Sequence, residues 1–355
     1  PSPKFEKISQ NVIVQKVYDM KSTSVSELRR DIVSGAWVVI ATGRGKRPHD
    51  FLEQKQTIFN QPKTACPFEN PDSPFFLAYD HEGRMTDENW QVQVIANKYP
   101  AFGKGACAVF QHAGPYEWTE GVGHHEVVIS RDHRKSLGMM TDREAELIFR
   151  AYQGRYLAVR DDPCVEYVSI FHNHGRLAGA SISHPHSQII AIPVIPPDIA
   201  HSLKGSKEYT KKNGSCVHCL IIDFELKENV RIIYKNEKFV VVSPYASRSA
   251  FEMRVYPRHH GAHFEAITDI DRLLLANAMR TALAKLNVGL KNPDFNFFLH
   301  TAPTGNSKEF DHYHWHFEIV PKTAIWAGFE IGTGIEISTI APEVAATFLR
   351  NIKIS

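Results

Sequence analysis

The chain lacks a strong net charge and any long apolar run, and each absence excludes a class of protein. Its 355 residues include 41 lysines and arginines against 39 acidic residues, which gives a net charge of +2. This balance argues against a large nucleic-acid surface and against a polybasic membrane anchor. No apolar run approaches the roughly 18 residues that a membrane-spanning helix requires. We therefore expect neither nucleic acid nor a membrane among its partners.

The amino-terminal residues lack the hydrophobic core of a signal peptide, and cysteine is scarce. The sequence begins Pro-Ser-Pro-Lys-Phe, which predicts a cytoplasmic protein. The five cysteines are Cys66, Cys107, Cys164, Cys216 and Cys219. An odd number, scattered over a chain without a signal, is more typical of metal ligation than of a disulfide framework. Nineteen histidines supply many nitrogen ligands.

The most informative segment is His184-Pro185-His186-Ser187-Gln188. We expect its two histidines to point to opposite faces of an extended strand, so that His184 is fixed by the protein while His186 faces a substrate. Gln188, two residues after His186, would share the substrate side. Such an arrangement suits a histidine nucleophile that accepts a phosphoryl or nucleotidyl group.

The same pattern recurs in the second half of the chain. His314 and His316 form another His-x-His, 130 residues downstream of the first. Residues 126–133 also resemble residues 252–260, with one residue of slippage. A fixed order of strands, helix and His-x-His strand, repeated with short connections, is typical of duplicated antiparallel units. The sequence therefore predicts an α+β fold of two tandem units, each an antiparallel sheet with flanking helices.

The repeat sets the expected domain boundaries. We predict an amino-terminal arm at 1–28, a first unit at 29–195, a linker at 196–214 and a second unit at 215–355. The linker is inferred from its prolines and from its Lys-Gly-Ser-Lys run.

Two capping-box motifs predict the main helices. Thr141, with Glu144 three residues later, opens a helix expected to run to about residue 160. Thr268, with Asp271 in the same relation, opens a helix through about residue 290.

Cysteine and histidine fall at matching places in the two halves. The set in the second half is Cys216, Cys219, His260 and His314. Two thiolates and two imidazoles are the composition of a tetrahedral structural zinc site. Two neighbouring histidines, His218 and His259, are rival ligands.

The corresponding set in the first half is Cys66, Glu69, His133 and His184. A carboxylate stands here where the repeat has a thiolate, which zinc tolerates. We therefore expect one or two zinc ions per chain. The alternative is that these cysteines are small buried residues and these histidines are hydrogen-bonded polar groups.

The nucleophile hypothesis requires further donors around a transferring phosphate. Asn173, Gly179 and Ser181 supply an amide, close backbone approach and a hydroxyl, which suit the negative charge of a transferring phosphoryl group. Gln188 can donate to a phosphate oxygen without adding charge.

Two other segments are candidates for binding a nucleotide. Arg44 and Arg47 lie in a glycine-containing turn and can clamp a diphosphate, although a solvated basic loop is the alternative. Asn97 precedes Tyr99, whose ring can stack on a base or equally pack in a tight turn.

Taken together, these motifs resemble the galactose-1-phosphate uridylyltransferase branch of the histidine-triad superfamily. The resemblance extends from about residue 28 to about residue 350. The matching segments are residues 44–48, 66–67, 97–101, 132–133, 173, 179–181, 184–188 and 328–334.

The resemblance implies a ping-pong reaction. His186 would attack the α-phosphorus of a nucleotide sugar, and the nucleotidyl group would then pass to a second phosphate-bearing acceptor. Gln188 would hold the phosphoryl oxygens, with Asn173 and Ser181 beside it, and the arginines at 44 and 47 would face the nucleotide. It also implies a homodimer in which residues 328–334 of one chain contribute to the partner's site.

Three departures from the family pattern affect this reading. Glu69 replaces the second cysteine of the first metal set, and Lys98 stands where many uridylyltransferases carry an acidic residue near uracil. Ser187 stands where the better-known sugar enzymes have glycine. The serine-rich signature and the Gly-Thr-Gly element within residues 328–334 are also similar to a plant-type relative, an ADP-glucose phosphorylase.

The sequence thus favours nucleotidyl transfer, with UMP moving between UDP-glucose and galactose 1-phosphate. The first alternative is phosphorolysis of ADP-glucose, with inorganic phosphate as the acceptor. A zinc-stabilised nucleotide-binding protein without turnover is the alternative from another class. Glu318 occupies the place of Gln188 in the second half, which predicts that only the first half is catalytic.

Overall fold

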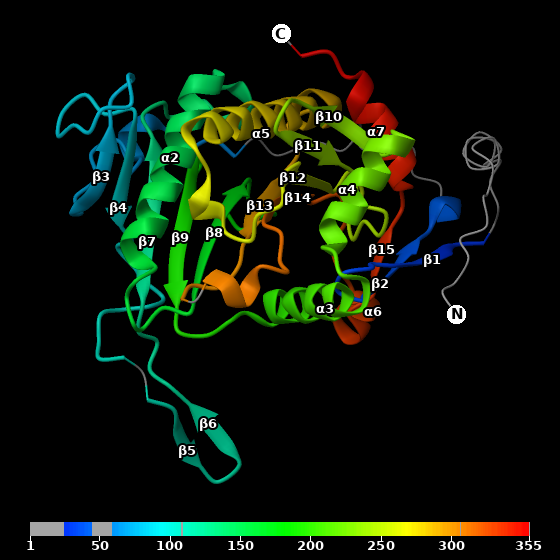
Figure 1. Cartoon of the computed structure of the whole chain (residues 1–355). Helices are drawn as coiled ribbons and strands as arrows, with labels where there is room; N and C mark the ends of the chain where they lie inside the picture. The colour runs from blue at the N-terminus through cyan, green and yellow to red at the C-terminus, as the bar shows by residue number, and fades with distance from the viewer. Residues whose placement is uncertain (1–24, 45–58, 108, 306, 355) are drawn as a thin grey trace.

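A ten-stranded antiparallel sheet runs through the molecule (Figure 1). The structure is a computed structural model that describes residues 25–44, 59–107, 109–305 and 307–354. The first half contributes β3 (Phe75–Tyr79), β4 (Val92–Ala96), β7 (His124–Ser130), β8 (Tyr167–His174) and β9 (His186–Ile192). The second half contributes β10 (Ile232–Lys235), β11 (Phe239–Val242), β12 (Met253–Pro257), β13 (Phe295–His300) and β14 (His316–Pro321).

The two halves of this sheet follow the same strand order. From the outer edge inward the order is β3-β4-β7-β9-β8 in one half and β10-β11-β12-β14-β13 in the other. The two inner strands pair with each other, with His174 opposite Phe295 and Phe171 opposite Phe298. The predicted repeat and the predicted α+β class with antiparallel strands are therefore confirmed, and one sheet serves both units.

Two long helices pack on the sheet, one from each half. They are α2 (Asp142–Val159) and α5 (Asp269–Leu290), and Figure 1 shows them along the same side of the sheet. Both begin with the predicted capping box, in which the hydroxyls of Thr141 and Thr268 accept the backbone N–H three residues later. A buried ion pair joins the helices, because Arg272 Nε donates to Glu146 Oε1 at 2.7 Å.

The core lies between these helices and the sheet. It contains rings that are fully enclosed, among them Phe149, Tyr152, Phe264, Phe297 and Phe317. Burying one such side chain contributes about 1.5–3 kcal/mol, so this layer dominates the stability of both halves.

The segment predicted as a linker is mostly helical. Helix α3 (Pro197–Asn213) starts with proline at its first position and ends at Gly214, whose φ of +69° closes it. A proline in the first turn is favourable because the missing N–H has no partner there in any case. Helix α4 (Val217–Glu228) follows directly.

The remaining elements lie at the edges of the sheet. They are β1 (Glu27–Arg30), β2 (Trp37–Ile40) and β15 (Glu336–Ser338) in a small sheet, the hairpin β5 (Gln111–Ala113) and β6 (Tyr116–Trp118), α6 (Gly328–Thr333) and α7 (Pro342–Asn351). Short 3-10 helices occur at Thr42–Arg44, Lys63–Ala65, Leu137–Met139, Phe264–Ala266 and Ser307–Phe310. Figure 1 shows the β5–β6 hairpin projecting from the body. No helix in the described part of the chain combines the length and the apolarity needed to cross a membrane.

Candidate active site and metal clusters

The four residues of the second predicted metal set come together at one place. Cys216 caps α4 and Cys219 lies in its first turn, while His260 follows β12 and His314 precedes β14. Cys219 Sγ lies 3.5 Å from His260 Nδ1 and 3.6 Å from His314 Nδ1, and Cys216 Sγ lies 3.9 Å from His314 Nδ1. Sulfur and nitrogen ligands of tetrahedral zinc are about 3.5 Å apart, given bonds of about 2.3 and 2.0 Å. The set therefore fits zinc.

The first predicted set is also assembled. The ligand atoms of Cys66, His133 and His184 lie within 4.8 Å of one another. Glu69 lies beside this group, with its Oε1 3.0 Å from His133 Nδ1 and 3.7 Å from His184 Nδ1. One thiolate, two imidazoles and one carboxylate can hold zinc in the same geometry.

All four histidines of these clusters are oriented in the same way. Each ring donates its Nε2–H to a backbone carbonyl, which leaves Nδ1 facing the cluster. The donor–acceptor pairs are His133 to Gln61 at 3.0 Å, His184 to Ser130 at 2.6 Å, His260 to Asp311 at 2.7 Å and His314 to Pro257 at 3.0 Å. Fixing the tautomer through the outer nitrogen is what metal-ligating histidines do in proteins.

His186 is held differently from His184. Its Nδ1–H donates to the carbonyl oxygen of His184 at 2.8 Å, so its Nε2 is free of that proton. Burial lowers the pKa of His186, although the hydrogen bond to His184 acts in the opposite direction. A neutral imidazole with an unprotonated Nε2 is the form that can act as a nucleophile.

The prediction that His184 and His186 point to opposite faces is wrong. Residues two apart share a face of a strand, so alternation cannot separate them. Both rings in fact contact the ring of Phe68, at centroid distances of 5.8 and 5.0 Å. Their different environments arise because β9 begins at His186, whereas His184 precedes the strand and turns toward Cys66.

Gln188 lies on the same face as His186, as predicted. Its Oε1 accepts a hydrogen bond from Nε2 of His125 at 2.8 Å. This leaves the NH2 group of Gln188 as a donor for a substrate. His125 also lies 2.9 Å from Nδ2 of Asn97, another predicted residue. The sequence gives no signal for His125, because only the pairing of β7 with β9 brings it to Gln188.

Asn173 is next to His186 in the sheet, since the preceding residue of β8, His172, pairs with Ser187. Asn296 Nδ2 donates to Asn173 Oδ1 at 2.7 Å, so the amide of Asn173 is also oriented with its NH2 group as the free donor. Asn296 belongs to β13, in the other half, and the sequence argument missed it.

The remaining predicted substrate residues are only partly placed. Gly179 has a φ of +89°, a conformation that favours glycine, and Ser181 is exposed in the β8–β9 connection. Arg44 ends the short helix at Thr42–Arg44, and the placement of its side chain is outside the description, as is the whole of Arg47.

Ser187, which departs from the family glycine, faces away from His186. Its hydroxyl is hydrogen-bonded to Tyr152 and to Nδ1 of His172, at 3.0 Å from the latter, on the helix side of the sheet. The serine therefore contacts the core rather than the candidate substrate side.

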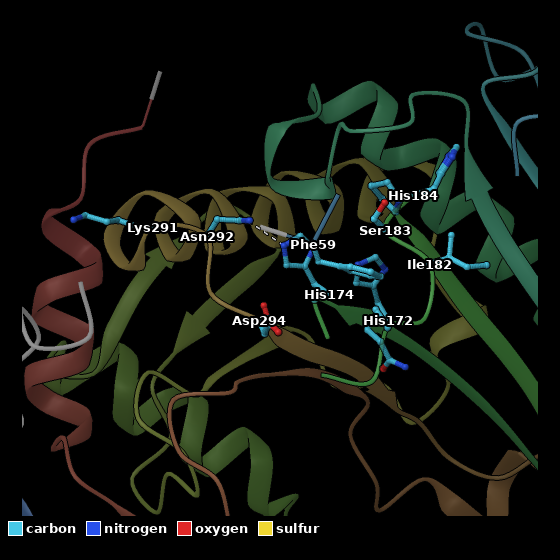
Figure 2. Close-up of a pocket in the computed structure, with 13 residues that line it drawn as sticks. Phe59, His172, His174, Ile182, Ser183, His184, Lys291, Asn292 and Asp294 are labelled. Atoms are coloured by element: carbon cyan, nitrogen blue, oxygen red, sulfur yellow. Dashed lines mark hydrogen bonds between the residues drawn. The ribbon is translucent and has the colours of Figure 1, made fainter. Parts of the chain in front are cut away.

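A cavity of about 470 Å³ adjoins the β8–β9 connection (Figure 2). Its lining includes Asn173 and His184 of the candidate site, together with His174 and Asp294, but neither His186 nor Gln188. His174 is fixed there by Asn292, with Nε2 and Oδ1 3.0 Å apart. The geometry of the polar groups, rather than cavity size, thus identifies the candidate catalytic side.

The second half repeats the histidine but not its surroundings. His316 Nδ1–H donates to the carbonyl of His314 at 3.0 Å, the same contact that His186 makes. Glu318 replaces Gln188, and its carboxylate lies 2.9 Å from Arg254 Nε and also pairs with Arg248. Burial would raise the pKa of Glu318, but the two arginines outweigh burial and hold it well below its usual range. The position beside His316 is therefore occupied by the ion pairs of Glu318 with Arg254 and Arg248.

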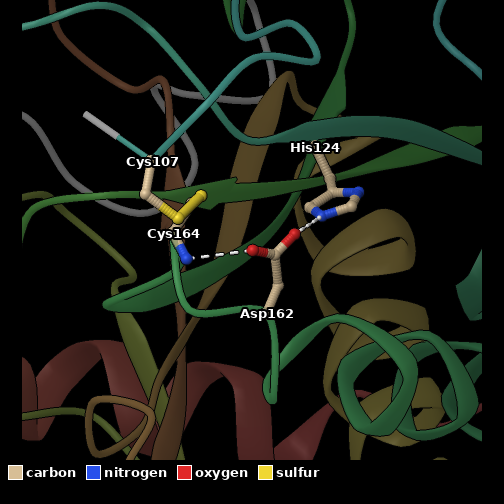
Figure 3. The surroundings of a disulfide bond; sticks show 4 residues. All are labelled: Cys107, His124, Asp162 and Cys164. Carbon is tan, nitrogen blue, oxygen red and sulfur yellow. Dashed lines mark hydrogen bonds and ion pairs between the residues drawn. A yellow bond between two sulfur atoms is a disulfide. The ribbon is translucent and has the colours of Figure 1, made fainter.

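Two cysteines form a disulfide, contrary to the expectation of metal ligation. Cys107, in the long β4–β7 connection, is bonded to Cys164, which follows α2 (Figure 3). Beside it, Asp162 accepts a hydrogen bond from the Cys164 N–H and pairs with Nε2 of His124 at 2.8 Å. Cys107 and Cys164 had no counterpart in the repeat, so their pairing had no signal in the sequence.

Sequence comparisons agree with this geometry. A family model described as the galactose-1-phosphate uridyl transferase N-terminal domain matches residues 16–196, and a domain of unknown function matches residues 121–352. The chain is 33% identical to ADP-glucose phosphorylase of Arabidopsis thaliana, with 93% of each chain covered. It is 26% identical to galactose-1-phosphate uridylyltransferase of Thermotoga maritima, with 92% of this chain and 99% of the relative covered.

Solved structures give the same result. The ADP-glucose phosphorylase of Arabidopsis thaliana with bound ADP-glucose has a TM-score of 0.78 at 31% identity, covering 93% of this chain and 100% of that one. A uridylyltransferase has a TM-score of 0.70 at 26% identity, covering 92% and 97%. The chain therefore belongs to the galactose-1-phosphate uridylyltransferase family and is a nucleotidyltransferase.

Proposed function

We propose that His186 carries the nucleotidyl group between a nucleotide sugar and a phosphate-bearing acceptor. The observation that carries this proposal is the hydrogen bond from His186 Nδ1 to the His184 carbonyl. It fixes the proton on the nitrogen that does not react and leaves Nε2 as the nucleophile.

In the first step, Nε2 of His186 forms a bond to the α-phosphorus while the bond from that phosphorus to the bridging oxygen breaks. The oxygen leaves with the sugar 1-phosphate. The free NH2 groups of Gln188 and Asn173 donate to the phosphoryl oxygens, where charge builds up in the transition state. The acceptor's phosphate oxygen then attacks the same phosphorus and restores the histidine.

The donor that we favour is ADP-glucose, with inorganic phosphate as the acceptor. The higher identity and TM-score with the Arabidopsis thaliana phosphorylase support this choice over the uridylyltransferases. The exchange of UMP between UDP-glucose and galactose 1-phosphate, which the motifs favoured, is the second candidate, and the match to the uridyl transferase domain supports it.

Labelling distinguishes the two donors. Protein incubated with ADP-glucose or with UDP-glucose, each radiolabelled in the α-phosphate, should become labelled with the nucleotide that it transfers. Inorganic phosphate or galactose 1-phosphate should then discharge that label as the corresponding nucleotide product. Label from UDP-glucose alone would select the second candidate, and absence of label from both would refute the covalent histidine.

We propose that both clusters hold zinc and that it acts structurally. Cys216, Cys219, His260 and His314 would tie α4 to the ends of β12 and β14. Cys66, Glu69, His133 and His184 would tie the segment before β3 to the ends of β7 and β9. Zinc in the Cys66 cluster would also fix His184, whose carbonyl oxygen accepts the hydrogen bond from His186.

We also propose a homodimer formed through the region of α6. Four apolar side chains are exposed there, with exposed fractions of 86% for Ile325, 50% for Trp326, 49% for Phe329 and 74% for Ile331. Several exposed apolar side chains within a short segment are a feature of interfaces. Analytical ultracentrifugation should give twice the chain mass, and Trp326→Glu should shift the protein toward monomer. Wild type that sediments as a monomer at micromolar concentration would refute the dimer.

A further inference from the structure

His125 lies between Gln188 and the loop that carries Asn97 and Ala101. It is part of β7, with its ring half-buried, and it belongs to none of the metal clusters. One ring nitrogen contacts the backbone of Ala101, and the other contacts the amides of Gln188 and Asn97.

The contact with Ala101 determines which nitrogen of His125 carries the proton. The backbone N–H of Ala101 can only donate, and it points at His125 Nδ1 at a distance of 3.0 Å. Nδ1 must therefore be the acceptor, so the neutral ring carries its proton on Nε2. That proton has Gln188 Oε1 as its acceptor at 2.8 Å. Nδ2 of Asn97 lies 2.9 Å from the same nitrogen, which has no lone pair in this tautomer, so the Asn97 amide contacts His125 without donating to it.

The tautomer in turn determines which end of Gln188 faces a substrate. With Oε1 held by His125, the NH2 group of Gln188 is directed to the open side of the strand, where a phosphate oxygen can accept from it. If the amide rotated by half a turn, it would lose the bond to His125 and present its oxygen to an anion. Without a partner for Oε1, the amide of Gln188 could adopt either orientation, and only one of them presents the NH2 group to a phosphate oxygen.

The neighbours of Glu318 in the second half differ in charge from the neighbours of Gln188. Gln188 pairs with Val127 across β9 and β7, and Glu318 pairs with Arg254 across β14 and β12. The residue two positions before Val127 is His125, and the residue two positions before Arg254 is Glu252. On the neighbouring strand, Gln188 therefore has an aliphatic side chain and an imidazole beside it, whereas Glu318 has a guanidinium and a carboxylate.

We propose that His125 is a positioning residue for nucleotidyl transfer, which it serves by orienting the amide of Gln188. Through Ala101 it also connects the loop that carries Asn97 to this amide, so that the position of the loop is transmitted to the phosphoryl-binding group. This inference rests on the proposed function, because it assigns Gln188 to the transferring phosphate.

Two substitutions at position 125 separate the positioning role from a structural one. In His125→Asn the amide reaches only as far as Nδ1 and cannot donate to Gln188, whereas in His125→Gln the amide reaches as far as Nε2 and can. The single-turnover rate of protein labelling by radiolabelled ADP-glucose, with UDP-glucose in parallel, should fall about 10- to 100-fold in His125→Asn. It should return to within about threefold of wild type in His125→Gln.

A double-mutant cycle tests the route through Gln188. If His125 acts by orienting this amide, His125→Asn should cost almost nothing further in the Gln188→Ala background. Circular dichroism and thermal unfolding of each variant verify that the fold is retained. Labelling of His125→Asn at the wild-type rate, or losses that multiply in the double variant, would overturn the proposal. If wild type itself takes up no label, it is the proposed function that fails.

Discussion

The two halves of the sheet place the same histidine in the same backbone geometry but surround it with opposite chemistry. His186 and His316 each donate Nδ1–H to the carbonyl two residues before them. In the first half the neighbouring position is a neutral amide, whereas in the second half it is a carboxylate paired with two arginines. The difference indicates that a correctly held histidine is insufficient, and that room for an incoming phosphate is the second requirement.

The largest expected effect comes from removing the nucleophile. His186→Gly should lower the turnover of ADP-glucose or UDP-glucose by about 1,000-fold or more, because covalent transfer has no substitute route. The matched control, His316→Asn, should stay within about threefold of wild type, since that histidine has no free donor amide beside it. Steady-state assays of product formation measure both. If His186→Gly retained turnover, His186 would not be the nucleophile.

A second substitution makes the first half resemble the second. Gln188→Glu places a carboxylate beside the transferring phosphate, where like charges repel. We expect about a 100-fold loss of the labelling rate, with thermal stability little changed because the residue is half-buried and faces the site. The uncharged control Gln188→Asn shortens the donor without adding charge and should lose less. Equal losses in both variants would show that charge is not the reason that the second half is silent.

The reciprocal substitution should act on stability and not on activity. Glu318→Gln removes the buried carboxylate that pairs with both Arg254 and Arg248, although Arg254 keeps Asp31 as a partner. Breaking a buried pair costs about 3–5 kcal/mol. Denaturant unfolding should show this loss of the free energy of unfolding, while the labelling rate per folded molecule stays the same. A gain of nucleotide labelling on His316 would contradict the interpretation that its pocket is filled by its own arginines.

The smallest effects on chemistry should follow removal of the second metal cluster. Cys219→Ser should release about one zinc ion per chain, as measured by elemental analysis. It should lower the unfolding temperature and leave the labelling rate of the folded protein nearly unchanged. Cys66→Ser should release the other ion and slow labelling as well, because the cluster includes His184, which holds His186. A wild-type protein with one ion would indicate that Glu69 does not complete a site.

Features encoded locally were the ones that the sequence predicted well. The capping boxes at Thr141 and Thr268 and the repeat of strands depend on neighbouring residues, and they appear where expected. The cysteines and histidines of both predicted metal sets also lie close together, and duplication places them at matching positions in the sequence.

Features that depend on long-range pairing were missed. The contact of His125 with Gln188 requires β7 beside β9, and the contact of Asn296 with Asn173 requires β13 beside β8. The cysteine pair at 107 and 164 is brought together by the fold alone. The prolines at 196 and 197 favour a linker over a helix in the sequence, but proline is also common in the first turn of a helix, and α3 begins there.

The pairing of β8 with β13 has a consequence for how the protein can be divided. Because the ladder passes without interruption from one half to the other, neither half has an independent edge there. A fragment that ends near residue 195 would expose the edge of β8 from Phe171 to His174, which carries Asn173. Unpaired strand edges of this kind recruit other chains. The second half therefore covers an edge of the first that would otherwise be open, which is a physical reason to retain it whether or not it performs chemistry.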